Sequence, residues 1–139
     1  MVVGNGPDGI AFDGAHLWVA NSTDGTVAEV DPITEQVLQT VAVQSDPTAV
    51  AFTGHHIWVT NSGSNSVSEI DISSGTDVMD VSVGNDPQGI AFDGSALWVA
   101  NYQDGKIQSF GAAIPGGGGL TVGVGAGPTG LPSTGLISG

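Results

Sequence analysis

An internal repeat of forty residues limits the architectures open to this chain more than any local pattern does. One short segment occurs three times at that interval, as "HLWVAN" (16–21), "HIWVTN" (56–61) and "ALWVAN" (96–101). A proline, a phenylalanine and a glycine outside these segments recur at the same interval. With the tryptophans and asparagines of the segments, the repeated residues are Trp18, Trp58, Trp98, Asn21, Asn61, Asn101, Pro7, Pro47, Pro87, Phe12, Phe52, Phe92, Gly14, Gly54 and Gly94. A fixed period of this length is typical of repeat proteins, in which each unit packs on its neighbours.

Each repeat predicts four short strands. In the first unit these are "GIAFDG" (9–14), "HLWVAN" (16–21), "TVAEVDP" (26–32) and "EQVLQTVAV" (35–43). Val, Ile, Phe and Trp dominate the strands, and Gly, Asp, Asn and Pro separate them. Asp24-Gly25, Asp104-Gly105 and, less strongly, Ser64-Asn65 suit tight hairpin turns that need positive φ. Apolar residues nowhere follow helical spacing over ten or more positions, so we predict an all-β chain.

The second strand indicates which all-β architecture to expect. "LWVA" is apolar at successive positions, so both of its faces should be covered. A unit of this length with four strands and two covered faces is typical of a propeller blade. Small residues in the first strand fit a crowded centre, and polar residues in the fourth fit an outer edge: Gly9, Ala11, Gly89 and Ala91 against Gln39, Thr40, Asp77 and Asp80. A β-sandwich is the alternative, but it does not require three copies at one spacing.

The repeat also resembles a known family. "PDGIAFDGAHLWVANSTDGTVAEVDPIT" (7–34) and "WVTN" (58–61) are similar to the YVTN/NHL-type β-propeller repeat, with Trp in place of Tyr. Streptogramin lyase-like propeller repeats carry Leu-Trp at the same place. The resemblance covers roughly residues 2–110 and implies the propeller fold, but such blades serve enzymes, receptors and adhesins alike. In the lyase-like enzymes a histidine base and a magnesium ion act, and no position here can be matched to their residues.

The predicted organisation is a partial β-propeller of about three four-stranded antiparallel blades and a Gly-rich tail. The blades are units 5–44, 45–84 and 85–110, and residues 111–139 are a low-complexity tail with a degenerate repeat remnant. The third unit departs from the others, because Ser109-Phe110-Gly111 replaces Glu29-Val30-Asp31 and "AAIPGGGG" replaces the outer strand. Propellers close with about four to eight blades. Three blades therefore predict either a piece of a longer propeller or self-association of copies that completes the ring.

The charge balance excludes two classes of partner. Lys106 is the single Lys or Arg against fourteen Asp and Glu, which gives a net charge of −13. Such a surface repels nucleic acid and anionic lipid.

The chain has no cysteine for a disulfide or a thiolate metal site, no signal peptide, and no apolar run long enough for membrane insertion. We predict no cofactor.

Candidate binding residues follow from the direction of the strands. Neighbouring strands of a blade run in opposite directions. The loops before each first strand therefore lie on the same face as the loops between the second and third strands. We expect the ligand-binding residues on that face to be Asp24, Asp46, Asp86, Tyr102 and Asp104, with Asn5, Asp8, Asn85 and Gln103 beside them. The opposite face carries Asp13, His16, His55, His56, Asp31, Asp71 and Asp93. Ligands of repeat folds usually meet loops on one face.

Two patterns on the opposite face have a chemical and a structural interpretation. His16 and His56 are equivalent, with Ala96 in the third unit, and could share a metal or act as an acid–base pair; the alternative is exposed turn residues. Glu29 with Asp31, and Glu69 with Asp71, offer oxygens to a divalent cation, but their spacing does not support a site, and turns along a solvated edge are the alternative. We favour the structural interpretations, so no catalytic or metal residue is predicted.

The repeated tryptophans and asparagines are predicted to be structural. Trp18, Trp58 and Trp98 lie within apolar segments, so packing between blades is favoured over stacking on a sugar. Asn21, Asn61 and Asn101 each end a second strand, where an Asn side chain braces the following turn.

The tail contains "LPSTG", formed by Leu131, Pro132, Ser133, Thr134 and Gly135. This string resembles the sorting signal at which sortases cleave surface proteins, here between Thr134 and Gly135. Only "LISG" follows, so the apolar segment and basic end of a full signal are missing. The alternative is a repeat remnant, because "PTGLPSTG" aligns with "PDGIAFDG".

Two functions remain after these arguments. The first is a non-catalytic propeller module, extracellular or on the cell surface, that binds a protein or glycan through its loops. The second is a streptogramin lyase-like enzyme whose active site is completed by missing blades. Low charge density and the sorting-like motif favour the first.

Overall fold

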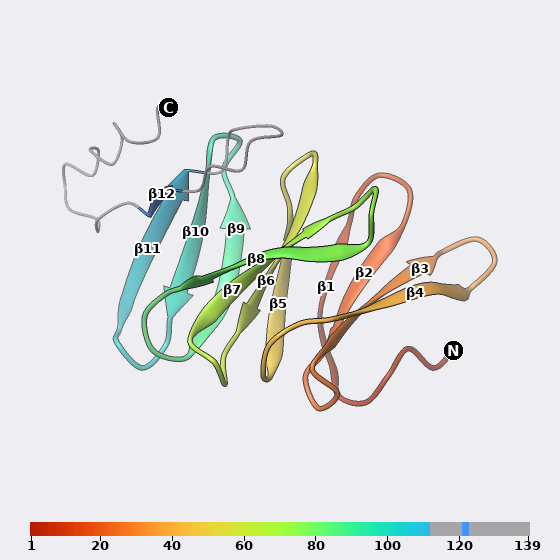
Figure 1. The fold of residues 1–139 in the computed structure, drawn as a ribbon, viewed down its shortest axis with the longest axis horizontal. Helices are drawn as coiled ribbons and strands as arrows, with labels where there is room; N and C mark the ends of the chain where they lie inside the picture. The colour runs from red at the N-terminus through yellow and green to blue at the C-terminus, as the bar shows by residue number, and fades with distance from the viewer. Residues whose placement is uncertain (112–120, 123–139) are drawn as a thin grey trace.

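A computed structural model describes residues 1–111 and 121–122, and all regular structure in that part is β-strand. The first sheet contains β1 (Pro7–Phe12), β2 (Leu17–Asn21), β3 (Thr26–Asp31) and β4 (Gln36–Ala42). The second contains β5 (Pro47–Phe52), β6 (His56–Asn61), β7 (Ser66–Asp71) and β8 (Thr76–Ser82). The third contains β9 (Pro87–Phe92), β10 (Ala96–Asn101), β11 (Lys106–Gly111) and β12 (Thr121–Val122). Figure 1 shows the three sheets side by side, the second between the others.

Each sheet is an antiparallel meander in which consecutive strands are hydrogen-bonded neighbours. Shifts in the register of strand pairing also recur at equivalent positions. The register shifts between Glu29 and Val30 in the first sheet and between Glu69 and Ile70 in the second. Three equivalent meanders confirm the all-β partial propeller, and each sheet is one blade.

The first strands of the blades lie at the centre, where neighbouring backbones approach closely. A Cβ added to Gly9 would lie 2.4 Å from the carbonyl oxygen of Thr48 on β5. The Thr48 Oγ1 in turn donates a hydrogen bond to the carbonyl oxygen of Pro87 at the start of β9, at 3.3 Å. The prolines begin β1, β5 and β9, where a strand tolerates the missing N–H. The predicted crowding of the first strands is therefore correct.

The apolar core lies between the blades. We call the side of each blade that carries Trp18, Ala20 and Val27, or their equivalents, its leading face, and the side that carries Phe12, Leu17 and Val19 its trailing face. The leading face of the first blade and the trailing face of the second form one cluster: Trp18, Ala20, Val27 and Val41 with Ile57, Val59, Ile70, Val50 and Phe52. The next junction repeats it with Ala51, Trp58 and Val67 against Leu97, Val99, Phe110, Ile90 and Phe92. Packing of Trp18 and Trp58 between blades is confirmed.

The outer strands are the most exposed, as their polar sequence predicts. Most residues of β4 and β8 are exposed or half-buried. In the third blade, the short β12 pairs Val122 with Phe110 and Thr121 with Gly111. A two-residue outer strand therefore completes this sheet from within the predicted tail, and β11 reaches Gly111. Residues 112–120 and 123–139, including Leu131–Gly135, lie outside the described residues.

The hairpin turns behave as expected, and so do two of the three asparagines. Gly25, Asn65 and Gly105 have φ of 68°, 53° and 64°, the left-handed conformation that these turns need. Across the turn, the Asn21 Nδ2 donates to Thr26 Oγ1 at 3.3 Å and the Asn61 Nδ2 to Ser66 Oγ at 3.1 Å. The Asn101 Nδ2 donates to Gln108 Oε1 instead, at 3.0 Å. In the part of the chain that the structure describes, no helix is long and apolar enough to span a membrane.

One outer-strand carboxyl makes stability depend on pH. Burial, and next the negative charge of Asp80, raise the pKa of Asp77 to about 6. The native state then favours neutral Asp77, so this contribution to stability is present below the ordinary pKa near 3.8 and is lost as the pH rises through about 6.

We therefore expect Asp77→Asn to stabilise the chain at pH 8 by about 1 kcal/mol, after allowance for the partial exposure of the group, and to change little at pH 4. Urea denaturation at both pH values measures the difference, with Asp8→Asn on the exposed part of β1 as the control. An equal effect of Asp77→Asn at the two pH values contradicts the assignment.

Candidate functional site

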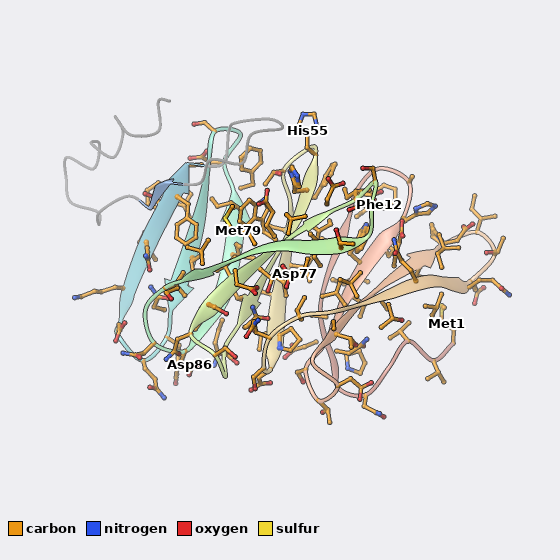
Figure 2. The ribbon with its side chains drawn as sticks, viewed as in Figure 1. Met1, Phe12, His55, Asp77, Met79 and Asp86 are labelled. Atoms are coloured by element: carbon orange, nitrogen blue, oxygen red, sulfur yellow. The ribbon has the colours of Figure 1, made fainter. Side chains whose placement is uncertain are left out.

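The loops gather at two opposite ends of the blades. Figure 2 shows Asp86 at one end and His55 at the other. We call the first end, which includes the turn at Asp24, the Asp24 face, and the second the His56 face. Each sequence-predicted candidate lies on the face to which the alternation of strands assigned it, because every blade is a regular meander.

An open groove of about 720 Å³ crosses the Asp24 face between the first two blades. It lies between the β2–β3 turn of the first blade and the link from β4 to β5. Its lining is mostly hydroxyl, amide and carboxylate: Ser22, Thr23, Asp24, Gly25, Thr26, Ala42, Val43, Gln44, Ser45, Asp46 and Ser64. Two of the five predicted ligand-binding residues, Asp24 and Asp46, therefore share one groove.

The Asp24 carboxylate also binds the segment that precedes β1. It accepts hydrogen bonds from the Asn5 backbone N at 2.8 Å and from Asn5 Nδ2 at 3.0 Å. In the third blade Asp104 accepts the same pair of bonds from Asn85, at 2.8 and 2.9 Å. These bonds lower the pKa of both aspartates, because they stabilise the charged form. Both residues therefore remain ionised and also hold the entering segment on the β2–β3 or β10–β11 turn.

Asp46 and Asp86 precede the prolines that begin β5 and β9, and both have left-handed backbones, with φ of 61° and 58°. Their carbonyl oxygens accept bonds from the Ser62 N and the Tyr102 N, each at 2.9 Å. The Asp86 Oδ1 also accepts a bond from Gln88 Nε2. The Asp46 carboxylate lines the groove and, within residues 1–111, accepts no such bond. Asp46 is therefore the predicted residue best placed to meet a ligand.

On the His56 face, two histidines pair with buried glutamates. The His16 Nδ1 lies 2.8 Å from Glu29 Oε1, and the His56 Nδ1 lies 3.4 Å from Glu69 Oε2. Glu29 and Glu69 are only 6% and 4% exposed. The expectation of exposed turn histidines and of glutamates on a solvated edge is therefore wrong, because both glutamates point from the third strand into the packed leading face.

The third blade carries a sequence signal for this pair. Ala96 replaces the histidine and Ser109 replaces the glutamate, so both members disappear together. That joint change is the sequence signal that links the two positions. Burial raises the pKa of Glu69, although His56 lowers it and Asp71 raises it further. Asp31 and Asp71 themselves cap turns, accepting bonds from Ile33 N and Ser73 N at 2.8 Å, as expected.

One group on this face has the composition of a metal site. Ligand atoms of Asp13, His16 and Glu29 lie within 4.8 Å of one another. However, Asp13 Oδ1 accepts from the backbone N of His16, Asp13 Oδ2 accepts from Trp18 Nε1, and Glu29 Oε2 accepts from Gln39 Nε2. His56 is not part of this group, so in the described chain the two histidines do not form one ligand set. The hydrogen bonds account for the cluster without an ion.

A cleft of about 500 Å³ opens beside these residues. It is lined by Asp13, Phe52, Gly54, His55, His56, Asp71, Ile72 and Ser73. It lies between the first two blades, so this junction has a groove at the Asp24 face and a cleft at the His56 face.

The indole N–H groups reveal a difference between the repeats. Trp18 Nε1 donates to Asp13 Oδ2 at 2.8 Å, and Trp98 Nε1 donates to Asp93 Oδ2 at 2.9 Å. Thr53 occupies the equivalent position in the second blade, and the buried Trp58 Nε1 has no partner among the described residues. The turn itself is unchanged, because Gly14, Gly54 and Gly94 have φ near 100°.

We expect Thr53→Asp to stabilise the chain by about 1 kcal/mol, because it gives the buried Trp58 N–H an acceptor. The free energy of unfolding from urea denaturation measures the effect. Thr53→Ala is the matched control, since it also removes the threonine hydroxyl but supplies no acceptor. If Thr53→Asp is no more stable than Thr53→Ala, the interpretation is wrong.

Comparisons with known proteins identify the fold. No family model matches the chain, and no curated protein matches it in sequence. Among solved structures, the hydrazine synthase of Kuenenia stuttgartiensis is similar with a TM-score of 0.72 and 31% identity, over 81% of this chain and 34% of that chain. The Cps50 (Swd1) β-propeller domain of Myceliophteria thermophila has a TM-score of 0.71 and 16% identity, over 96% and 44%. A putative 6-phosphogluconolactonase of Bacteroides uniformis has a TM-score of 0.69 and 16% identity, over 84% and 39%.

These similarities show a β-propeller scaffold. This chain spans less than half the length of each of the three structures. The resemblance to the YVTN/NHL repeat and the alternative of a lyase-like enzyme completed by further blades stay predictions.

Proposed function

We propose that this chain is a non-catalytic binding module whose Asp24 face binds a protein or glycan partner. The observation that carries the proposal is the open groove between the first two blades, in which hydroxyl, amide and carboxylate groups converge. Binding residues of repeat folds are carried on such loops, while the strands beneath them supply a rigid support.

The chemistry of the groove favours a neutral or cationic partner. Its hydroxyls and the Gln44 amide suit the hydroxyl groups of a sugar, and the Asp46 carboxylate suits a sugar hydroxyl or a lysine ammonium group. The net charge of −13 opposes an anionic partner. A neutral glycan and a basic protein segment are therefore the two partners that the groove fits.

The groove is held in shape before any partner arrives. Asn5 ties the entering segment to Asp24, and the Ser22 N donates to the Gly6 carbonyl oxygen at 2.7 Å. On the other side, the Ser45 N donates to Ser64 Oγ at 2.9 Å. Loops fixed in this way lose little conformational entropy on binding, which favours affinity.

Titration calorimetry of the chain with neutral oligosaccharides and with a lysine-rich peptide tests the proposal. We expect one of these two classes to bind, and Asp46→Asn with Thr23→Ala to weaken that binding about tenfold or more through lost hydrogen bonds. His55→Ala on the His56 face is the matched control and should bind normally. No binding of either class, or equal losses in both variants, contradicts the proposal.

We also propose that the module lies outside the cell or on its surface. The sorting-like string Leu131–Gly135 and the low charge density of the chain support this location. Antibody labelling of intact cells that express the native gene tests it, with permeabilised cells as the control. Labelling only after permeabilisation contradicts the location, and an unchanged surface signal for Thr134→Ala contradicts sorting through this motif.

A further inference from the structure

The two ends of the blade array carry complementary apolar faces. At the junctions within the chain, Trp18 and Trp58 on the leading faces are 0% and 2% exposed. On the leading face of the third blade, Trp98 is partly exposed and Ile107, equivalent to Val27 and Val67, is 58% exposed. The trailing face of the first blade is its counterpart, with Ile10 and Phe12 at 58% and 55% exposure.

The two terminal faces match each other in type, because the chain already packs a leading face on a trailing face at both of its internal junctions. Trp18 packs on Ile57, Val59 and Ile70, and Trp58 packs on Leu97, Val99 and Phe110. The equivalent residues of the first blade are Leu17, Val19 and Val30, and of these Val19 and Val30 are already buried in a cluster with Val3. The receiving surface that the first blade offers to Trp98 of another copy is therefore formed by Ile10 and Phe12, equivalent to the Val50 and Phe52 that pack with Trp18.

We propose that two copies of this chain associate head to tail to close a six-bladed ring. The leading face of the third blade of each copy packs on the trailing face of the first blade of the other. Six blades lie within the range of about four to eight in which propellers close. A ring of two copies buries all four terminal faces, whereas contact between two leading faces leaves Ile10 and Phe12 exposed. This association is independent of what the Asp24 face binds.

The mass of the 139-residue chain in solution is the first test. Sedimentation equilibrium should give a dimer of the 13.8 kDa chain over a wide range of concentrations. Phe12→Ser and Ile107→Ser should each raise the dissociation constant about tenfold or more, because each alters both junctions of the ring. Val78→Ser, at a half-exposed apolar position in the middle blade, is the control and should remain dimeric.

Three results overturn the ring. A monomer at all concentrations shows that the terminal faces do not join, and a mass that rises without limit shows an open array. A dimer unaffected by Phe12→Ser shows that the copies pair in another way. Circular dichroism of each variant, matched to the parent chain, establishes that a loss of mass is not a loss of fold.

A mixture of the two variants tests the direction of packing. A dimer of one Phe12→Ser chain and one Ile107→Ser chain keeps one junction unaltered and concentrates both changes in the other. We therefore expect the mixture to associate more tightly than either variant alone. No gain on mixing contradicts head-to-tail packing.

Cross-linking separates the closed ring from an open array. Because Thr48 contacts Pro87 between the second and third blades, Gln88 should contact Pro7 of the other copy. The chain has no cysteine, so Pro7→Cys with Gln88→Cys introduces the reactive pair alone. Oxidation should give a covalent dimer as the largest product, and Pro7→Cys by itself should give none. A ladder of larger products, or no cross-link in the double variant, contradicts the ring.

Discussion

Trp58→Ala should lower the free energy of unfolding by about 3–5 kcal/mol, the usual cost of truncating a buried Trp. Trp58 is 2% exposed and lies in one cluster with Leu97, Val99 and Phe110 of the next blade. Its removal leaves a cavity between two sheets. The loss of stability grows with the part of that cavity that the surrounding side chains do not fill. Since domains are stable by only about 5–15 kcal/mol, this variant should be close to unfolded at 37 °C.

Trp98→Ala is the matched control for that result. Trp98 occupies the equivalent position, and its indole N–H donates to Asp93, a bond that Trp58 lacks. Its face has no neighbour within the described chain. In the Phe12→Ser background, at a concentration at which sedimentation equilibrium gives the mass of a monomer, the cost of Trp98→Ala should be well under half that of Trp58→Ala. Urea denaturation followed by circular dichroism measures both. Equal costs would show that the tryptophans act within their own blades and not between them.

Gly9→Ala should be strongly disruptive, although it adds only one methyl group. The added Cβ would lie 2.4 Å from the Thr48 carbonyl oxygen and 2.8 Å from the Ala49 Cα, and both are backbone atoms that cannot rotate away. Strands β1 and β5 must therefore separate at the centre of the array. We expect a loss of about 1–3 kcal/mol or more, the range found for overpacked cores.

Gly89→Ala makes the equivalent change in the third blade. There the nearest contact is the Ala100 Cβ, at an acceptable 3.4 Å, because within residues 1–111 no further blade packs beside β9. The substitution should be neutral or stabilise by up to about 1 kcal/mol, since alanine restricts the unfolded chain. Thermal unfolding of the two variants, again in the Phe12→Ser background, compares them. If Gly9→Ala is as well tolerated as Gly89→Ala, the close approach of β1 and β5 is wrong.

Much of the fold follows from the sequence because the same strand pattern occurs three times at one interval. One "LWVA" segment could be a buried strand in many folds, but three at one spacing require equivalent sheets that bury each other. The centre is predictable for the same reason, since Gly9 and Gly89 are small at one position of the first strand. The direction of the strands then assigns every loop to a face.

The site was less predictable, because side-chain partners depend on distances that a repeat does not reveal. Asp24 and Asp104 were predicted as ligand residues from their face alone, and the structure adds that they bind Asn5 and Asn85. Glu29 and Glu69 were expected at a solvated edge, because an acidic residue in a strand is rarely buried without a partner. The partners His16 and His56 lie thirteen residues away along the chain and become neighbours only through the pairing of the second and third strands.

The central claim is that apolar side chains of one blade stabilise the next. A double-mutant cycle with Trp18→Phe on β2 and Ile57→Val on β6 measures this directly, because the two residues belong to different sheets and to one cluster. We predict a coupling free energy of about 0.5–3 kcal/mol, as for residues in contact. Additive effects of the two substitutions, within about 0.3 kcal/mol, would show that the sheets do not pack through these residues and would contradict the fold described above.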